Sequence, residues 1–526
     1  MSQVTLALLL LLGGTVAGQV NSGRVLGDVH DPSGALVSST ALTIKNEATG
    51  VETTRASGEK GQYSFAALPP GIYALTAAKQ GFQQYRRAGI ELHLDQQLRV
   101  DIQMIIGGSD AITVTDTAPE LQTESASLGK VIGAGAIRDL PLLSRNFQDL
   151  LLLVPGVAPG AGGNISNYAV NGQREFANSI VINGVEVTGN RNNDSNLRPS
   201  VDAVEEFKAI TSGYEAEFGR SGGGVVAIQT RSGGNAFHGA LFEFLRTNKT
   251  TARSFFAPQA SALKENSFGG TLGGPLRRGK TFFFAGYEAK RTRDSFSYLA
   301  NTVPNGAGRD FSRSLDPYTG QPIPIFDPQF YASNFYAQQF PGNVIPVARV
   351  SPAGLRTLQT LFPKPNAPGI LNGWFNNYQV SQSYRFHSDT GDLRLDHTIN
   401  ARQRVSLTYD VTDFRSLTGD PFEGAIPVHG GGGADSGDRT TSGNHSVGGT
   451  HVFNVRPNQL NELRVSFVQA SVSQDHLLGS SPQPQVYLAF GVLAAGPWAP
   501  ARRIWAPASS ISLCAPVSMP MLALSM

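Results

Sequence analysis

The sequence predicts a mainly β protein built from several consecutive units. Glycine is abundant, at 59 of 526 residues, and charged residues make up only 16% of the chain, against a usual ~25%. Short strand-like runs separated by turns fill residues 23–106, and longer alternating segments follow from residue 236. Beyond the N-terminus no run approaches the ~18 apolar residues of a membrane-spanning helix, so strands are expected to carry the architecture.

Composition excludes several function classes. The formal net charge is only +2, which gives no reason to expect nucleic acid as a partner. A single cysteine, Cys514, excludes an intrachain disulfide and a multi-cysteine zinc site. None of the nine histidines begins a His-x-x-Glu pair, so we expect no catalytic residues, metal or cofactor.

The first residues have the form of a secretory signal. An apolar core, Leu6–Leu12, is followed by small residues, which predicts a signal peptide over 1–18 with cleavage near Ala17 or Gly18. No Lys or Arg precedes the apolar run, and a buried first strand is the alternative. The true start could also lie upstream of Met1.

Residues 23–106 predict a small sandwich, with about seven short strands in about 80 residues. Asp31-Pro32-Ser33-Gly34 and Leu68-Pro69-Pro70-Gly71 supply turns between them. The run DPSGALV…NEATGVETT…GEKGQYSFAALPPGIYALTAAKQGF closely resembles the carboxypeptidase regulatory-like domain. The resemblance implies a transthyretin-like β-sandwich without catalytic groups.

Residues 121–232 carry mixed helix and strand signals. LPLLSRNFQDLLLLVPGV predicts a helix from Ser144, its N-cap, to Leu153, with Pro155 ending it. Asn183-Gly184 between alternating runs favours a type I′ hairpin. This unit resembles the α/β plug domain of TonB-dependent outer-membrane receptors. The string GRSGGGVVAIQTRSGGNAFHG, Gly219–Gly239, resembles the junction where such a plug ends and the β-barrel begins.

Residues 233–475 alternate apolar with small or polar residues, which is typical of transmembrane strands. Short connectors between them are expected to face the periplasm, while the insertions 291–385 and 412–443 are expected to be extracellular loops. This part is therefore expected to form a partial transmembrane antiparallel β-barrel. The expected strands are Ala236–Arg246, Asn266–Leu276, Thr281–Lys290, Asp389–His397, Arg404–Val411, Asn444–Phe453 and Leu460–Gln469.

The tail, 476–526, differs in composition. It contains no Asp, Glu or Lys but holds the only cysteine. Barrels of plugged transporters use about 22 strands, far more than the segments found. We therefore expect a truncated copy whose tail is atypical and possibly out of frame; a genuine hydrophobic tail is the alternative.

Across residues 23–474 the resemblance is to Oar-like TonB-dependent receptors. It implies export to the bacterial outer membrane, contact with its lipid, and transport of an unknown large extracellular ligand. In the linker 107–120, Ile112-Thr113-Val114-Thr115 resembles the TonB box, which a periplasmic energy-coupling protein of the TonB type captures by β-augmentation. An ordinary linker strand is equally compatible with that tetrapeptide.

Polar residues in the plug loops are candidate ligand contacts, and solvated loops packing against the barrel wall are the alternative. A surface adhesin or structural envelope protein that does not transport is the rival function. The candidate contacts are Asn164, Asn167, Tyr168, Arg174, Asn190, Arg191, Asn192 and Asn193.

Overall fold

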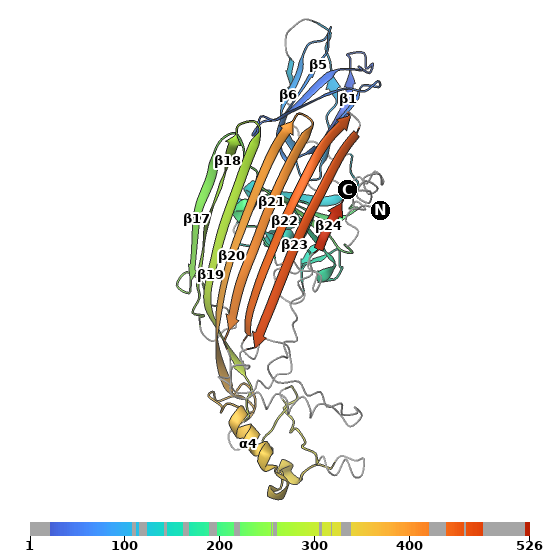
Figure 1. Ribbon diagram of the computed structural model, residues 1–526. Helices are drawn as coiled ribbons and strands as arrows, with labels where there is room; N and C mark the ends of the chain where they lie inside the picture. Colours follow the sequence, from blue (N-terminus) through green and yellow to red (C-terminus); the bar gives the residue numbers. More distant parts are fainter. Residues whose placement is uncertain are drawn as a thin grey trace, which may run out of the picture.

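The computed structural model arranges the chain as a sandwich at one end of a large curved sheet, with the plug unit against the sheet's inner face (Figure 1). It describes residues 22–107, 112–114, 124–140, 142, 145–160, 168–188, 197–214, 221–253, 255, 260–303, 308–316, 318–327, 338–419, 438–456, 459–476 and 521–525. The expected signal peptide, residues 1–18, lies outside the described residues.

The N-terminal unit is a β-sandwich. One sheet contains β1 (Gly23–His30), β4 (Gln62–Leu68), β7 (Gln97–Arg99) and β8 (Ile102–Gln103). The other has the order β3 (Glu52–Ala56), β2 (Ala41–Asn46), β5 (Gly71–Ala78), β6 (Tyr85–Leu92) and β9 (Ile112–Val114). Alternating residues of both sheets, such as Val25, Phe65 and Leu75, form one buried core, as expected for a sandwich.

The plug unit is built on a five-stranded sheet. Its order is β10 (Leu128–Gly133), β15 (Val204–Ser212), β16 (Val225–Thr230), β13 (Ser179–Ile182) and β14 (Val185–Glu186). β13 runs parallel to β16, and the other pairs are antiparallel. A second pair joins β11 (Val157–Pro159) to β12 (Tyr168–Val170), and the short helices are α2 (Ala134–Asp139), η2 (Glu175–Ala177) and η3 (Val201–Ala203).

Two local predictions in the plug have different outcomes. The helix expected over 144–153 is a 3₁₀ helix, η1 (Phe147–Leu153), and its cap is Asn146, whose side chain accepts from Gln148 N at 3.1 Å. Ser144 lies outside the described residues. The hairpin prediction is confirmed, because Ile182 pairs with Val185 and both Asn183 and Gly184 have positive φ, 50° and 79°.

The third unit is one antiparallel sheet of eight strands in chain order. Each of the seven expected segments is a strand, and six of them are clearly longer than predicted. The eighth, β24, lies in the tail and pairs with β23. The bounds are β17 (His238–Thr247), β18 (Lys264–Arg277), β19 (Thr281–Ala300), β20 (Tyr378–Asn400), β21 (Gln403–Thr418), β22 (Asp438–Arg456), β23 (Gln459–His476) and β24 (Met521–Ser525).

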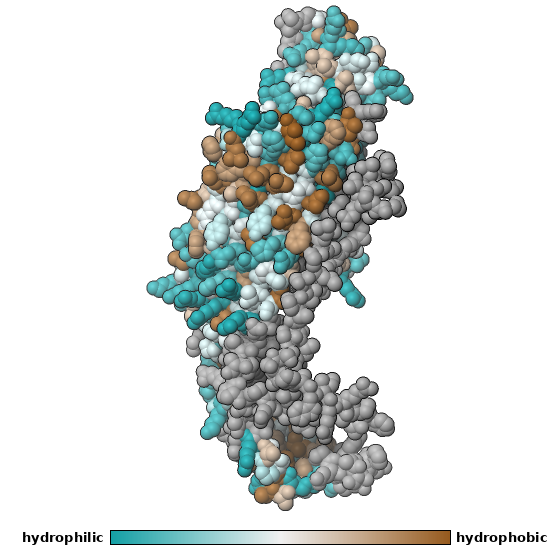
Figure 2. Space-filling model, in the orientation of Figure 1, coloured by the Kyte–Doolittle hydropathy of each residue, from teal (hydrophilic) through white to brown (hydrophobic). Residues whose placement is uncertain are grey.

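The two faces of this large sheet differ in polarity. Outward residues such as Leu241, Leu272 and Leu407 are exposed, and apolar side chains gather in a band across the strands (Figure 2). Inward residues such as Asp392 and Asp410 are polar and buried against the plug. This alternation is the pattern of a barrel wall between lipid and lumen. Among the described residues no helix has the length and apolarity needed to span a membrane.

At the end of the sheet away from the sandwich, the chain between β19 and β20 forms a separate layer (Figure 1). It contains η5 (Pro341–Asn343), η6 (Val347–Arg349) and α4 (Pro352–Leu361). Ser351 caps α4, accepting from Gly354 N at 3.2 Å, and Pro352 at the first helical position fits the helix start.

Candidate functional site

The plug is held against the barrel wall by a charged cluster around Arg145. Its Nε donates to Glu288 Oε1 on β19 at 2.9 Å, and its Nη2 donates to Asp202 at 2.6 Å. The guanidinium also lies 4.4 Å from the ring centroids of Phe242 and Phe244 on β17. Burial disfavours the charge, but the hydrogen bonds and charges of the two carboxylates outweigh it and raise the pKa of Arg145. Arg145 thus remains a cation that joins two units.

The segment before η3 is fixed to the same wall. Ser200 Oγ donates to Glu288 Oε2 at 2.8 Å, and Ser200 N donates to Asp392 on β20 at 3.2 Å. Arg198 N donates to Thr412 Oγ1 on β21 at 3.1 Å. Three neighbouring barrel strands therefore share the contacts of one plug segment.

A second cluster lies where the plug chain enters the barrel. Asp396 on β20 accepts from Arg394 Nε at 2.8 Å, Ser232 Oγ at 2.9 Å and Ser406 Oγ at 2.6 Å. Arg394 Nη1 also donates to Thr230 O, at the end of β16, at 3.0 Å. Each member of this cluster has a hydrogen-bond partner, so the cluster fixes the end of the plug chain to β20.

Gly233 shows why the junction is rich in glycine. A Cβ at this position would lie 2.3 Å from Phe283 O and 2.6 Å from Gly274 O. Any other residue would force the plug's exit segment away from β18 and β19.

The sandwich is joined to the plug through the turn after β6. Lys208 Nζ on β15 donates to Asp95 O and Oδ2, both at 2.9 Å. Glu206, on the same strand, accepts from Leu94 N and is bonded to His93 Nδ1 at 3.0 Å. The hydrogen bond to Glu206 raises the pKa of His93, against the opposing effect of burial.

The sandwich also contacts the ends of the barrel strands. Asn235 donates from its N to Ala48 O at 3.0 Å, and from Nδ2 to Thr49 O at 2.5 Å. Arg404 Nη2 donates to Ala67 O at 2.8 Å, and Arg55 donates to Asn454. The sandwich thus covers the junction end of the sheet.

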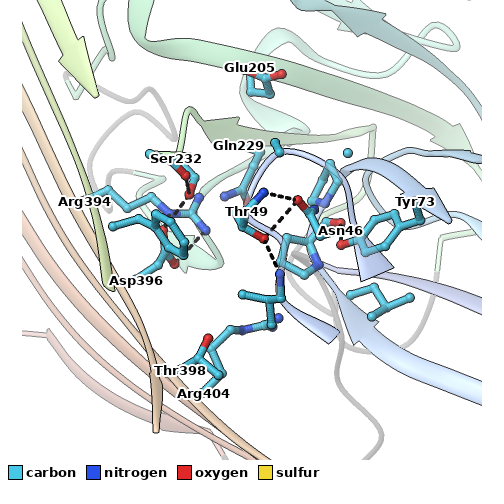
Figure 3. Close-up of a pocket in the computed structure, with 18 of the residues that line it drawn as sticks. Asn46, Thr49, Tyr73, Glu205, Gln229, Ser232, Arg394, Asp396, Thr398 and Arg404 are labelled. Atoms are coloured by element: carbon cyan, nitrogen blue, oxygen red, sulfur yellow. Dashed lines mark hydrogen bonds and ion pairs between the residues drawn. The ribbon is translucent and has the colours of Figure 1, made fainter. Parts of the chain in front are cut away.

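A cavity of about 190 Å³ lies where the three units meet (Figure 3). Its walls combine apolar side chains, such as Ile44 and Phe282, with polar ones and with the Arg394–Asp396 ion pair. Burial raises the pKa of Tyr73, which also lines the cavity, to about 12. The Tyr73 hydroxyl is neutral and donates to Pro69 O at 2.6 Å. The labelled lining residues are Asn46, Thr49, Tyr73, Glu205, Gln229, Ser232, Arg394, Asp396, Thr398 and Arg404.

The structure brings few of the predicted site residues together. Ile112, Thr113 and Val114 form β9, which pairs with β6 of the sandwich, and Thr115 lies outside the described residues. Tyr168 is buried in the plug core, so a ligand could reach it only after rearrangement, and Arg174 is exposed beside η2. Six candidate contacts lie outside the described residues: Asn164, Asn167, Asn190, Arg191, Asn192 and Asn193.

The residues that actually join the units were not predicted from the sequence. Arg145 lies inside the motif LPLLSRNFQDLLLLVPGV, which marked the plug but not the role of its arginine. Lys208 is the one basic residue in the otherwise apolar or acidic run Val204–Ile210, and a buried cation usually requires a partner. That signal could have drawn attention to it.

Comparison with known families agrees with the three units. Residues 24–105 match a carboxypeptidase regulatory-like domain, residues 122–226 a TonB-dependent receptor plug domain, and residues 229–503 an outer membrane beta barrel domain. The chain belongs to the TonB-dependent receptors. The barrel match extends beyond residue 475, where we expected family resemblance to end, and the domain boundaries remain predictions.

Among curated proteins, this TonB-dependent receptor is similar to the TonB-dependent transporter Oar of Myxococcus xanthus. The two are 28% identical over 356 residues, which cover 63% of this chain and 32% of the relative. The chain therefore spans about a third of that relative's length. The order of units and this similarity make it an Oar-like receptor of the bacterial outer membrane.

Solved structures similar to this receptor include the outer membrane transporter YddB from Escherichia coli. That structure is 13% identical, with a TM-score of 0.39, covering 66% of this chain and 40% of the other. The siderophore receptor PiuA from Acinetobacter baumannii is 11% identical, with a TM-score of 0.35, covering 66% and 46%.

Proposed function

We propose that this chain takes part in energised transport of a large ligand across the outer membrane. The observation that supports this most is the plug held inside the barrel wall by Arg145, Glu288 and Ser200. A passage through the barrel requires these contacts to break, and the work for that must come from outside the chain. No covalent bond is made or broken in this scheme, so the chain is not an enzyme.

In this proposal the sandwich end of the sheet faces the periplasm, and α4 lies on the extracellular side. A TonB-type coupling protein captures the segment Ile112–Thr115 by adding a strand to it. The unknown ligand is held by extracellular loops and the plug loops, among them the candidate contacts at Arg174 and Asn190–Asn193. The rival function, adhesion without transport, requires no movement of the plug.

Plug movement can be measured without knowing the ligand. Ala203 is fully buried in the plug, and a Cβ at Gly286 of β19 would lie 3.4 Å from its Cβ. In a Cys514→Ser background, Ala203→Cys should react with a maleimide dye in energised cells and stop reacting when an uncoupler is added. Ser33→Cys, on an exposed sandwich turn, is the control that reacts in both states.

Deleting residues 112–115 should abolish the energy-dependent labelling of Ala203→Cys. Labelling that is the same with and without the uncoupler, or that survives the deletion, contradicts transport and favours the adhesin.

We also propose that the eight strands form only part of a barrel. Within the described residues β17 pairs only with β18, and β24 only with β23. Unpaired backbone groups of such edges cost several kcal/mol each in lipid. Further strands, from whatever source, are needed to close the wall.

A further inference from the structure

The segment Ile112–Val114 is already part of a sheet. As β9 it runs parallel to β6, with Tyr85 opposite Ile112, Arg86 opposite Thr113, and Arg87 opposite Val114. Earlier in the chain, Ile106 forms an antiparallel bridge with Phe82, and Gln83 N, two residues before β6, donates to Ile105 O at 2.8 Å. The segment is therefore held by the sandwich and is not an isolated linker peptide.

β9 ends its sheet. The strand order is β3-β2-β5-β6-β9, so one edge of β9 faces β6, and no described strand pairs with its other edge. The N–H and C=O groups along an edge strand are a template for one more strand. Capture by β-augmentation uses such groups, and β9 offers them without leaving β6.

The sheet that carries β9 is itself fixed to the plug. β6 leads into the turn 93–96, where Lys208 and Glu206 of β15 bind Asp95, Leu94 and His93. A force on β9 therefore reaches the central plug sheet through β6 and this turn, as well as through the covalent linker.

We propose that the sandwich presents the coupling strand: the coupling protein adds its strand to the outer edge of β9 while β9 stays paired with β6. This inference rests on the proposed transport function. Holding the strand extended in advance removes the ordering cost that a free peptide incurs on binding. If the sandwich presents β9, a covalent link between β9 and β6 should preserve binding of the coupling protein. If the sandwich instead shelters β9, the strand would have to leave β6 before the coupling protein could bind it.

A cysteine pair tests the placement of β9. In the full chain with Cys514→Ser, Arg86→Cys and Thr113→Cys are register partners, and neighbouring strands lie ~4.8 Å apart, within disulfide range. Glu91→Cys with Thr113→Cys is the matched control, because Glu91 lies five residues along β6, about 17 Å away. Mild oxidation of outer membranes should link the first pair and not the second.

Binding then tests presentation. The oxidised Arg86→Cys/Thr113→Cys chain should bind the purified periplasmic domain of a TonB-type protein as tightly as its reduced form, or up to about tenfold more tightly. Loss of binding on oxidation, restored by a reductant, would overturn presentation and show that the sandwich shelters the strand. Equal disulfide formation in both pairs, or in neither, would overturn the docking itself.

Hydrogen exchange of the unsubstituted chain covers the case in which the cysteine variants fold poorly. Backbone amides of residues 112–114 should exchange at least about tenfold more slowly than in a peptide of residues 107–120. Exchange at the peptide's rate would contradict the docking. If β9 is found paired with β6 but no form of the chain binds the coupling domain, the proposed transport function is contradicted, while the placement of β9 stands.

Discussion

Lys208 is a buried cation whose ion-pair partner lies in another unit. It is 3% exposed, and its Nζ donates to the backbone and side-chain oxygens of Asp95. Lys208→Met should destabilise the sandwich–plug connection by about 3 kcal/mol, because it leaves Asp95 partly buried without its counter-charge. The measurement is urea unfolding in detergent micelles, followed by the fluorescence of a dye on the sandwich.

The matched control is Lys45→Met. Lys45 pairs with Glu52 at 2.9 Å, but both side chains are half exposed. Such a pair contributes less than about 1 kcal/mol. Equal losses for the two variants would mean that the contact with Asp95 does not hold the units together.

His93 gives the same connection a pH dependence. Its pKa is raised, chiefly by the hydrogen bond to Glu206 and also by the charge of Glu91. Because the folded-state pKa is raised, protonated His93 contributes its full stabilisation below the unfolded-state pKa of ~6.5. This stabilisation is lost as pH rises through the folded-state pKa. The midpoint of urea unfolding should therefore fall as pH rises through this range, and His93→Gln should flatten the profile. An unchanged profile in His93→Gln would assign the dependence to another group.

The residues that hold the plug against the barrel wall could not be identified from the sequence, because their contacts join distant segments. Arg145, Asp202 and Glu288 are ordinary polar residues in the sequence and acquire their role only when distant segments meet. Glu205 and Glu206 are consecutive residues of β15 and therefore face opposite sides of the strand: Glu205 is exposed, whereas Glu206 is buried beside His93. Local periodicity gives the face of a strand but not what that face contacts.

At the scale of elements, the Asn183–Gly184 turn sets the register of β13 and β14. Gly184 has φ 79°, a conformation that costs an L-residue about 1–2 kcal/mol. Gly184→Ala should destabilise the plug by this amount in urea unfolding. Gly135→Ala, in α2 with open space around it, should be neutral or stabilising. If Gly135→Ala lowered the free energy of unfolding as much as Gly184→Ala, the positive φ of Gly184 would not be the cause of the loss.

Strand positions were predictable, and strand lengths were not. Alternation identified β17 to β23, because one face meets lipid and the other the plug. β20 spans Tyr378–Asn400, although only Asp389–His397 was expected. Its first part still alternates, with Tyr378, Val380, Tyr384 and Phe386 on one face. Most of the extra residues fall in the insertion 291–385, which was wrongly expected to be a loop. β24 was missed because its pairing with β23 is non-local.

At the scale of the whole molecule, the open sheet makes a prediction about assembly. The chain of 526 residues, expressed alone, should show no heat-modifiable migration on gels after outer-membrane extraction, because an unclosed sheet has no sealed barrel to resist detergent. A compact form that shifts on boiling would show that the chain closes a barrel, alone or with copies of itself.

The pairing of β19 with β20 continues after its neighbours have stopped. β18 begins opposite Arg293 and β21 ends opposite Tyr384, but the two strands stay paired up to Ala300 and Tyr378. This leaves a two-stranded ribbon roughly 20 Å long as the support of the α4 layer. A two-stranded ribbon twists more strongly than a wide sheet, and Val380 within it is fully buried. In the proposed orientation, the length and twist of this ribbon therefore set how far above the wall the α4 layer stands and in which direction it faces.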